Sequence, residues 1–291
     1  MSITKKTSNY LKNKTILITG GAGSIGYSLA KKVLEYPVKS VRVLDINEYA
    51  LFKLKHKVSD SRLRLLLGSI TDEGRVEMAC QNVDIIFHAA AIKNIEISEF
   101  NPIETIETNV NGLVNLIKVL NRTKPELFLN ISTDKAVNPS TLYGTTKQLA
   151  ERLCTWVGFQ GHHTKYATVR LGNVFETQGN VFEIWKEQKD NDLPLSITDP
   201  NMKRFFFHMD EAISFIFECI PLTDSGEIFI PKMKLYNIKD CADKISKNHK
   251  IIGIRKGEKL DEVLISDSEK KMALERKNMW IISEHKNKKL K

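Results

Sequence analysis

Tyr143 and Lys147 stand four residues apart in a segment whose pattern predicts a helix, so their side chains share one face. An ammonium group below a phenol favours the phenolate, which can take a proton from a sugar hydroxyl while a nicotinamide takes the hydride. Just upstream, the run Ser132-Thr133-Asp134-Lys135 adds an acid and a base that alcohol oxidation alone does not need. Loss of water next to a new ketone does need them, because one group removes a C–H proton and another protonates the leaving hydroxyl. These residues predict oxidation, dehydration and re-reduction in one site.

Short apolar, β-branched runs alternate with helical patterns along the chain before Gly172 and must position these side chains. Such runs lie at 14–19, 41–45, 63–67, 83–87, 127–131 and 168–171. Strands and helices that alternate at this spacing predict an α/β fold with a Rossmann-type, doubly wound parallel sheet. Beyond Gly172 the alternation breaks down, although a helix at 210–220 and a strand at 227–230 are predicted.

The chain has 291 residues, enough for one large α/β domain and a smaller lobe. We expect residues 1–172, with a returning segment at about 205–230, to form the dinucleotide-binding domain. Residues 173–204 and 231–291 are expected to form a smaller C-terminal lobe that binds the substrate. No clean linker separates the two parts, so their interface is expected to form the cleft.

A glycine motif at Gly20, Gly23 and Gly26 follows the first predicted strand and opens the next helix. In that context Gly20 permits a tight turn, Gly23 lets backbone N–H groups approach a pyrophosphate, and Gly26 lets helix and strand pack closely. The helix N-terminus also favours negative charge. The motif therefore predicts a dinucleotide site.

Asp45 ends the second predicted strand, where a carboxylate can bind the adenosine ribose diol and repel a 2′-phosphate. This favours NAD as the cofactor. NADP stays open because Arg42 lies close by, and Asp45 could instead cap a helix that starts near Asn47.

Composition limits the other classes of function. The net charge is +9, partly from four lysines at 286–291, and it suits either solubility or attraction of a polyanionic substrate. No nucleic-acid-binding module, apolar run long enough to span a membrane, or signal peptide is present, so we expect a cytoplasmic protein without membrane insertion. Cysteines are widely scattered and show no metal-ligand spacing, so no metal site is expected; they are Cys80, Cys154, Cys219 and Cys241.

The chain resembles the extended short-chain dehydrogenase/reductases, and among them the UDP-N-acetylglucosamine 4,6-dehydratases of polysaccharide and flagellin-sugar biosynthesis. The resemblance runs from Thr19 to about Ser266. It rests on these motifs: His88-Ala-Ala-Ala91, Ile92-Lys93, Asn101-Pro102, Thr108-Asn109-Val110-x-Gly112, Ser132-Thr-Asp-Lys-Ala-Val-Asn-Pro139, Tyr143-Gly144-x-x-Lys147, Arg170-x-Gly172-Asn173-Val174, Ile197-Thr198-Asp199, Met202-x-Arg204-Phe205, Gly226-Glu-Ile-Phe-Ile-Pro-Lys232 and Arg255-x-Gly257-Glu258-Lys259.

The chain looks most like the short, soluble family members that invert C5 and begin pseudaminic acid synthesis, because it is short, lacks transmembrane segments and has Tyr143, where the large membrane-anchored members carry Met. The departures from the family pattern fall in substrate and cofactor contacts. They are Asn94-Ile95-Glu96, Leu171, Asn180, Lys203 and Asp45-Ile46.

The resemblance implies a role for each catalytic residue. Tyr143, its pKa lowered by Lys147 and a cationic nicotinamide, would deprotonate the sugar O4, to which Thr133 also hydrogen-bonds. Lys135 would remove the C5 proton and Asp134 would protonate the C6 hydroxyl. The alternative is that Asp134 and Lys135 form only a surface ion pair after a strand.

Further contacts are expected around these residues. Cofactor contacts are expected from Gly20, Gly23, Ser24, Ile25, Gly26, Asp45, Ser69, Ile70, Ala89, Ala90, Ala91, Lys93, Tyr143 and Lys147. Substrate contacts are expected from Lys93, Asn173, Arg204, Arg255 and Glu258. Arginine forks match phosphate oxygens, so the two arginines are candidate clamps for the UDP diphosphate. Polar residues also brace loops, which is the alternative role for Arg204, Arg255 and Asn173. Asn109 is expected to support the active site.

The predicted activity is a nucleotide-sugar 4,6-dehydratase that acts on a UDP-sugar as a homo-oligomer. Two rival interpretations remain. A nucleotide-sugar C4 epimerase uses the same Tyr and Lys without the Asp134–Lys135 pair. A non-catalytic protein that senses nicotinamide redox state would not need Thr133, Tyr143 and Lys147 intact.

Overall fold

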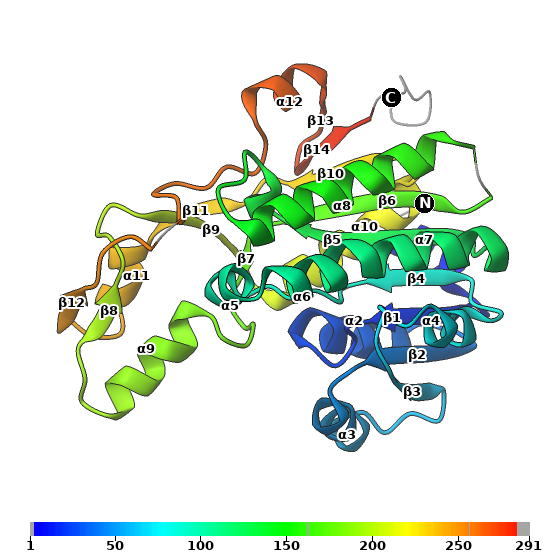
Figure 1. The fold of residues 1–291 in the computed structure, drawn as a ribbon, viewed down its shortest axis with the longest axis horizontal. Coiled ribbons are helices and arrows are strands. Elements are labelled where there is room, and N and C mark those ends of the chain that lie inside the picture. Colours follow the sequence, from blue (N-terminus) through cyan, green and yellow to red (C-terminus); the bar gives the residue numbers. More distant parts are fainter. Residues whose placement is uncertain (1–2, 162, 256, 284–291) are drawn as a thin grey trace.

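The computed structural model describes residues 3–161, 163–255 and 257–283 (Figure 1). The larger body is built on a nine-stranded sheet. Across that sheet the strands run β13 (Leu274–Glu275), β14 (Met279–Ile282), β10 (Glu227–Pro231), β6 (Lys165–Leu171), β5 (Leu127–Thr133), β4 (Ile85–His88), β1 (Thr15–Thr19), β2 (Ser40–Asp45) and β3 (Leu63–Leu67). From β3 to β10 every pairing is parallel, and the order reverses on either side of β1. The predicted doubly wound parallel sheet is confirmed.

Helices cover both faces of the sheet because the buried strands are apolar on both sides. One face is covered by α1 (Ile3–Leu11), α2 (Ser24–Leu34) and α10 (Met209–Cys219), whose apolar side chains share one core with the strands. The other face is covered by α4 (Glu73–Cys80), α7 (Gly112–Thr123) and α8 (Leu142–Phe159), which share a second core. The helix α3 (Glu48–Lys57) connects β2 to β3.

The shorter helices lie mostly in the connections between strands. They are α5 (Ile95–Phe100), α6 (Pro102–Ile106), the π-helical turn η1 (Glu107–Asn111), the 3-10 turns η2 (Asp134–Ala136) and η3 (Ile220–Leu222), and α12 (Asp267–Met272). None of the helices in the described segments combines the length and the apolar character needed to cross a bilayer.

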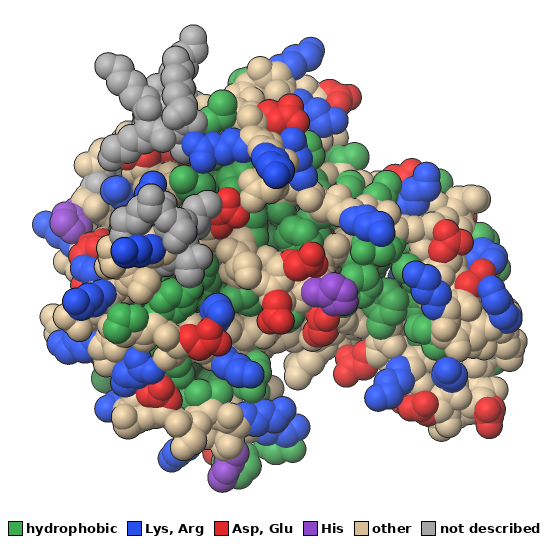
Figure 2. All heavy atoms as spheres, turned by 180° about the vertical axis from the view of Figure 1, so that it is seen from behind, with side chains coloured by type: hydrophobic (Ala, Val, Ile, Leu, Met, Phe, Trp, Pro, Cys, Tyr) green, Lys and Arg blue, Asp and Glu red, His purple; other side chains and the backbone are tan. Residues whose placement is uncertain are grey.

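A smaller lobe extends from the body at the carboxyl ends of the parallel strands (Figure 1). It contains two small sheets, one of β7 (Asn173–Val174), β9 (Lys203–Phe207) and β11 (Lys234–Asn237), the other of β8 (Leu195–Ile197) and β12 (His249–Ile251). With α9 (Val181–Asp190) and α11 (Ile238–Asp243) these strands enclose a separate apolar core around the fully buried Trp185. From behind, the lobe stands apart from the body across a notch (Figure 2).

The strand pairing departs from the expected domain division at two places. β9 belongs to the small lobe, because it pairs with β7 and β11. β14 and β13 extend the large sheet, because β14 pairs antiparallel with β10. Both pairings join segments far apart in sequence, which local patterns do not reveal. The lysine-rich tail at 286–291 lies outside the described residues.

Candidate active site

The glycine turn joins β1 to α2 and is shaped by close backbone contacts. Gly20 has φ +63°, and a Cβ there would lie 2.6 Å from the Cα of Ala90. A Cβ on Gly26 would lie 2.3 Å from the carbonyl oxygen of Gly20. Packing within the chain therefore requires glycine at both positions. A Cβ on Gly23 would meet only that same carbonyl oxygen, at 3.3 Å, so internal packing does not explain this glycine.

The features of this turn fit a dinucleotide. Gly23 is the N-cap of α2 and offers no side chain to the first turn of the helix, which leaves its N–H groups for a phosphate. Ser24 and Ile25 are partly exposed in that first turn. Ala89, Ala90 and Ala91 follow β4 directly, and the N–H of Ala89 donates to the carbonyl of Thr19. Ala89 and Ala90 lie against Gly20 of the glycine turn, at the carboxyl edge of the sheet.

Asp45 ends β2 beside the glycine turn. One carboxylate oxygen accepts from the N–H of Ala22 and the other from the N–H of Asn47, each at 3.0 Å. The cap of α3 is Asn47, whose side chain accepts from the N–H of Ala50. Asp45 therefore holds the glycine turn and the segment before α3 together at the carboxyl end of β2.

Ser69 and Ile70 follow β3 on the same edge. The hydroxyl of Ser69 hydrogen-bonds with that of Thr71, and Ser69 is partly exposed. The side chain of Ile70 is buried, and it lies where a Cβ on Gly112 would come within 2.7 Å of it. Ile70 thus packs against the first residue of α7.

The acid/base run is located where β5 ends. Thr133 is the last residue of β5 and caps η2, and its hydroxyl donates to Oδ1 of Asp134 at 2.9 Å. Nζ of Lys135 donates to the same oxygen at 3.1 Å and to Oδ1 of Asn173 at 3.3 Å. Asp134 is fully buried and its Oδ2 has no hydrogen-bond partner among the described residues, whereas the side chain of Lys135 is 18% exposed. This is a partly enclosed ion pair at the ligand edge of the sheet, not one on an open surface.

Tyr143 reaches this pair because α8 begins very close to η2. Thr141 caps the helix and accepts from the N–H of Gly144. A Cβ on Gly144 would lie 2.4 Å from the carbonyl oxygen of Lys135, so the Tyr143-Gly144 sequence is what permits this approach. The phenol of Tyr143 is hydrogen-bonded to Thr133.

The electrostatics of Tyr143 differ from expectation. Burial raises the pKa of the phenol, the Asp134 carboxylate raises it further, and the hydrogen bond with Thr133 lowers it. Lys147, buried one turn later, donates its Nζ to the carbonyl of Ile131 at 2.6 Å. In the protein alone the pKa of Tyr143 is therefore raised, and the expected lowering by Lys147 together with a cationic nicotinamide stays a prediction.

Lys147 is itself perturbed. Burial lowers its pKa from 10.5 to about 8, opposed by Cys154 and Glu151. Nearby, His88 is buried with Nδ1 2.7 Å from the hydroxyl oxygen of Thr19, and burial lowers its pKa to about 3. His88 is therefore a neutral structural group at neutral pH.

A buried network that the sequence did not predict holds the catalytic segments. The Ser132 hydroxyl donates to Glu151 at 2.6 Å, and Arg170 donates to both oxygens of Glu151. Arg170 also donates to both oxygens of Glu269. Since Ser132 precedes Thr133 and Glu151 follows Lys147 by one turn, the network fixes β5 and α8 relative to each other. The available signal was Arg170 within a predicted buried strand, because a buried arginine requires an acidic partner such as Glu151.

Asn109 supports the crevice as expected, through backbone contacts. In η1 its side chain accepts from the N–H of Ile92 and donates to the carbonyl of the same residue. It also donates to the Thr146 hydroxyl on α8 at 3.0 Å. Lys93, next to Ile92, donates to the carbonyl of Gln178, whose own N–H donates to the hydroxyl of Ser24.

The expected substrate residues of the lobe play different parts. Arg204 is buried, and its two terminal nitrogens donate to the carbonyls of Lys203, Lys259 and Leu260 and contact Glu258 at 3.4 Å. These contacts make Arg204 a brace of the loop at 258–260. Arg255 is exposed, and its backbone N–H donates to Glu258. Asn173 donates to the carbonyl of Phe205 while accepting from Lys135, so it joins the lobe to the acid/base pair.

Glu262 was missed by the sequence analysis. It is a buried carboxylate in the lobe, and the charges of both Asp134 and Lys135 influence its pKa, which burial raises. Its position shortly after the Arg255-x-Gly257-Glu258-Lys259 motif was the available signal.

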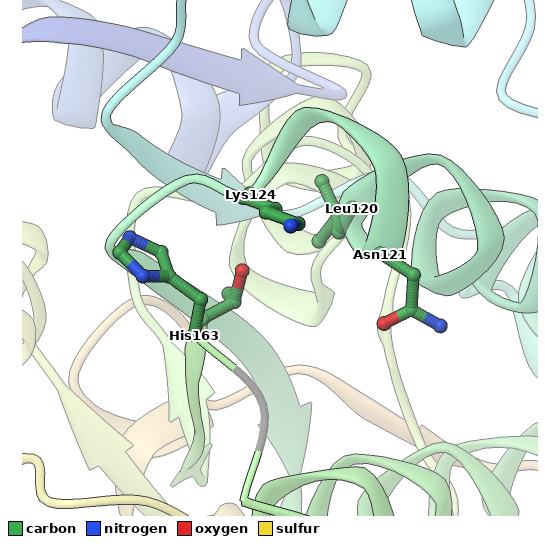
Figure 3. A pocket seen from close by; sticks show the side chains of 5 residues that line it. Leu120, Asn121, Lys124 and His163 are labelled. Carbon is green, nitrogen blue, oxygen red and sulfur yellow. The ribbon is translucent and has the colours of Figure 1, made fainter.

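A small hollow elsewhere is lined by Leu120, Asn121, Lys124, His163 and Thr164 (Figure 3). It lies where α7 ends and just before β6 begins, on the edge of the sheet opposite to Thr133. Its volume of about 40 Å³ has room for little more than a water molecule. This hollow cannot hold a nucleotide sugar.

Several known proteins are similar to this chain in sequence over most of their length. An uncharacterized membrane protein of Methanocaldococcus jannaschii is 41% identical over 94% of this chain and 87% of its own length. An inverting UDP-N-acetylglucosamine 4,6-dehydratase of Campylobacter jejuni is 36% identical over 93% of this chain and 83% of its own. A UDP-glucose 4-epimerase of Rickettsia felis is 31% identical over 88% of this chain and 79% of its own.

Solved structures show the same architecture. The crystal structure of Pen from Bacillus thuringiensis superposes with a TM-score of 0.91 at 33% identity, covering 94% of this chain and 90% of that one. The dTDP-glucose 4,6-dehydratase DesIV of Streptomyces venezuelae, solved with NAD and TYD bound, shares the fold, with a TM-score of 0.79 at 22% identity over 88% of this chain and 90% of its own. The sequence profile of the polysaccharide biosynthesis protein family matches residues 16–284. The chain thus belongs to that family, within the extended short-chain dehydrogenase/reductases that dehydrate or epimerise nucleotide sugars.

Proposed function

We propose that this protein is an inverting UDP-N-acetylglucosamine 4,6-dehydratase, whose product is a UDP-2-acetamido-2,6-dideoxy-hexos-4-ulose. One observation carries the proposal: the Asp134–Lys135 pair at the end of β5, joined by Thr133 to the phenol of Tyr143. A C4 epimerase needs the Tyr143 phenol but has no use for an acid and a base beside it. The similarity to the Campylobacter jejuni dehydratase supports the same choice.

We propose NAD as the cofactor, held by the glycine turn, the start of α2 and Asp45. When bound, NAD would supply the hydride acceptor for oxidation at C4 and the hydride donor for reduction at C6. The carboxylate of Asp45 already accepts two backbone N–H groups, and the lone pairs that remain can accept from a ribose diol. A 2′-phosphate there would face that negative charge.

In the first step Tyr143 accepts the proton of the C4 hydroxyl. A phenol whose pKa is raised by burial is protonated at neutral pH, so it becomes a base only when positive charge is added beside it. Oxidised nicotinamide carries such a charge, and the protonated form of Lys147 adds to it. Thr133 holds the phenol and can donate to the same substrate oxygen.

In the second step the C4 ketone acidifies the C5 proton, which Lys135 accepts in its neutral form. The C6–O bond breaks as Asp134 supplies a proton from Oδ2, and water leaves. Return of the hydride to C6, with addition of a proton to C5, would complete the 6-deoxy-4-keto sugar. Addition of that proton to the face opposite Lys135 gives inversion.

We propose that the smaller lobe holds the UDP portion. The exposed Arg255 is its candidate phosphate ligand, and Arg204 with Glu258 keeps the loop at 258–260 in place. Lys93 lies across the crevice, where surrounding protein and the charge of Lys135 lower its pKa.

The test is the Lys135→Ala variant, incubated with UDP-N-acetylglucosamine and NAD. Oxidation at C4 should still occur but water should not leave, so reduced nicotinamide accumulates and absorbs in the near ultraviolet.

Lys135→Arg should not restore dehydration, because a guanidinium cannot accept a proton near neutral pH. Asp134→Asn should slow the loss of the C6 hydroxyl while exchange at C5 persists, because an amide is a poor proton donor. Lys118→Ala removes an exposed lysine of α7 and serves as the control. Unimpaired formation of a 6-deoxy-4-keto sugar by Lys135→Ala would rule out Lys135 as the base.

A further inference from the structure

We propose that residues 176–180 form a strap that closes over the bound cofactor and slows its departure, with the backbone of Gln178 as the latch. The inference rests on the proposed function in one respect, that the glycine turn is the cofactor site. The N–H of Gln178 donates to the hydroxyl of Ser24 at 3.0 Å. The carbonyl of Gln178 accepts from Nζ of Lys93 at 2.8 Å. The backbone of one residue is therefore held by two side chains that are both expected to contact the cofactor.

The strap joins the two parts of the protein. It follows β7, which ends at Val174 and pairs with β9 of the smaller lobe, and it precedes α9, which begins at Val181 in the same lobe. Its middle lies against the larger body, because Ser24 begins α2 and Lys93 belongs to the loop after β4. The strap therefore runs from the lobe to the first turn of α2 and back.

Both ends of the strap are fixed by their own hydrogen bonds. At the first end, Oε1 of Glu176 lies 2.7 Å from Nδ1 of His208, and Oε2 accepts from the N–H of Met209 at the start of α10. At the other end, the side chain of Asn180 caps α9 by accepting from the N–H of Glu183. These contacts hold the strap beside the glycine turn, and the two hydrogen bonds of Gln178 close it.

The latch leaves hydrogen-bond donors for a phosphate. A hydroxyl has one O–H to donate and two lone pairs with which to accept. Ser24 accepts from Gln178, so its O–H is left to donate to a phosphate oxygen at the start of α2. An ammonium group has three N–H donors, and the carbonyl of Gln178 takes only one of those of Lys93. A pyrophosphate can therefore bind without breaking either hydrogen bond of the latch.

A bound cofactor should strengthen the latch. A hydroxyl that donates to an anion becomes a better acceptor, so a phosphate on Ser24 strengthens the hydrogen bond from Gln178. Coupling of binding free energies is reciprocal, so a closed latch in turn holds the cofactor more tightly. A strap that must open before the cofactor leaves adds the cost of opening to the barrier for dissociation. Loss of one latch hydrogen bond should therefore speed dissociation by about three- to tenfold.

A single substitution can remove the latch donor. Gly179 has φ +70° and Gln178 has a negative φ, and proline is common directly before the glycine of such a turn. Gln178→Pro therefore suits the backbone while it removes the N–H that donates to Ser24. Gln178→Ala removes the exposed side chain but keeps that N–H, so it is the matched control.

The experiment measures how fast each protein releases the cofactor. Each protein is loaded with NADH and mixed with a large excess of NAD in a stopped-flow instrument, and the change in NADH fluorescence gives the dissociation rate. Gln178→Pro should release NADH about three- to tenfold faster than the wild-type protein, whereas Gln178→Ala should release it at the wild-type rate.

A double-mutant cycle tests the second hydrogen bond of the latch. Lys93→Met removes the donor to the carbonyl of Gln178. If both hydrogen bonds close one strap, Lys93→Met should speed release less in the Gln178→Pro background than in the wild-type protein. Equal effects in the two backgrounds would show that Lys93 acts only through its own contact with the cofactor, and would remove it from the latch.

If Gln178→Pro does not fold, Glu176→Ala takes its place, because it frees the first end of the strap and should speed release in the same direction. Release at the wild-type rate from a folded strap variant would overturn the strap while leaving the dehydratase proposal intact. A wild-type protein that binds no NADH would instead overturn the proposed cofactor site, and this inference with it.

Discussion

Replacing Lys147 by Met should change how the stability of the fold depends on pH. Lys147 is 5% exposed, and burial lowers its pKa from 10.5 to about 8. Between these values the folded chain binds fewer protons than the unfolded chain, so the free energy of unfolding rises with pH. The contribution is complete above the unfolded pKa of 10.5 and is lost as pH falls through about 8. A shift of this size is worth about 3 kcal/mol in total, of which about 2.5 kcal/mol develops between pH 7 and pH 10.

Urea unfolding of the wild-type protein and of Lys147→Met, followed by circular dichroism at several pH values, measures this directly. Other titrating groups cancel in the difference between the two proteins. Wild type minus variant should therefore rise by about 2.5 kcal/mol from pH 7 to pH 10. Lys118→Met, at an exposed site on α7, should give a flat difference. A flat difference for Lys147→Met would mean that the lysine titrates normally and that burial does not control its charge.

The remaining predictions concern the base, the cofactor and the glycine turn. Tyr143→Phe should cut turnover at least about a hundredfold while calorimetry finds cofactor binding nearly unchanged, since only the proton acceptor is lost; near-normal turnover would exclude Tyr143 as the base. NAD should bind more tightly than NADP, and Asp45→Ser should narrow the gap because repulsion of the 2′-phosphate disappears; a wild-type preference for NADP in the same titration would contradict this. Gly26→Ala should lower the unfolding temperature, because its Cβ would lie 2.3 Å from a backbone oxygen. Gly23→Ala should leave the unfolding temperature unchanged and weaken cofactor binding. The opposite pattern would show that Gly23 is required for packing.

Short sequence patterns were enough to predict the strands, whose formation depends on neighbouring residues in the chain. The apolar runs predicted the central parallel strands because strands buried on both faces are continuously apolar. The strand expected at 63–67 coincides with β3, a partly exposed strand at the sheet edge. β5 continues two residues beyond its predicted end, to Thr133, and this extension places the acid/base run at the ligand edge. The addition of β14 to β10 was not predictable in this way, because antiparallel pairing at a sheet edge depends on a long-range contact.

In the candidate site, too, features set by local sequence were predicted and features set by long-range contacts were not. Glycine spacing predicted the turn at Gly20–Gly26, and the contact of Gly26 with Gly20 is local, whereas the contact of Gly20 with Ala90 appears only in the folded chain. Lys147 donates to a backbone carbonyl, and Arg204 donates mainly to backbone carbonyls, which carry no sequence signature, so the sequence could not show that both side chains are occupied. The charge of Asp134 influences Glu262 only in the folded chain, and the separation of the two residues in sequence concealed this.

The most direct test of the central claim is incubation of the purified protein with NAD and UDP-N-acetylglucosamine in deuterated water, with the product followed by NMR. The dehydratase account predicts a new methyl group at C6, a keto group at C4 and solvent deuterium at C5, because the C5 proton is removed and replaced from solvent. A product that differs only in configuration at C4, without a methyl group and without deuterium at C5, would contradict the account and establish an epimerase.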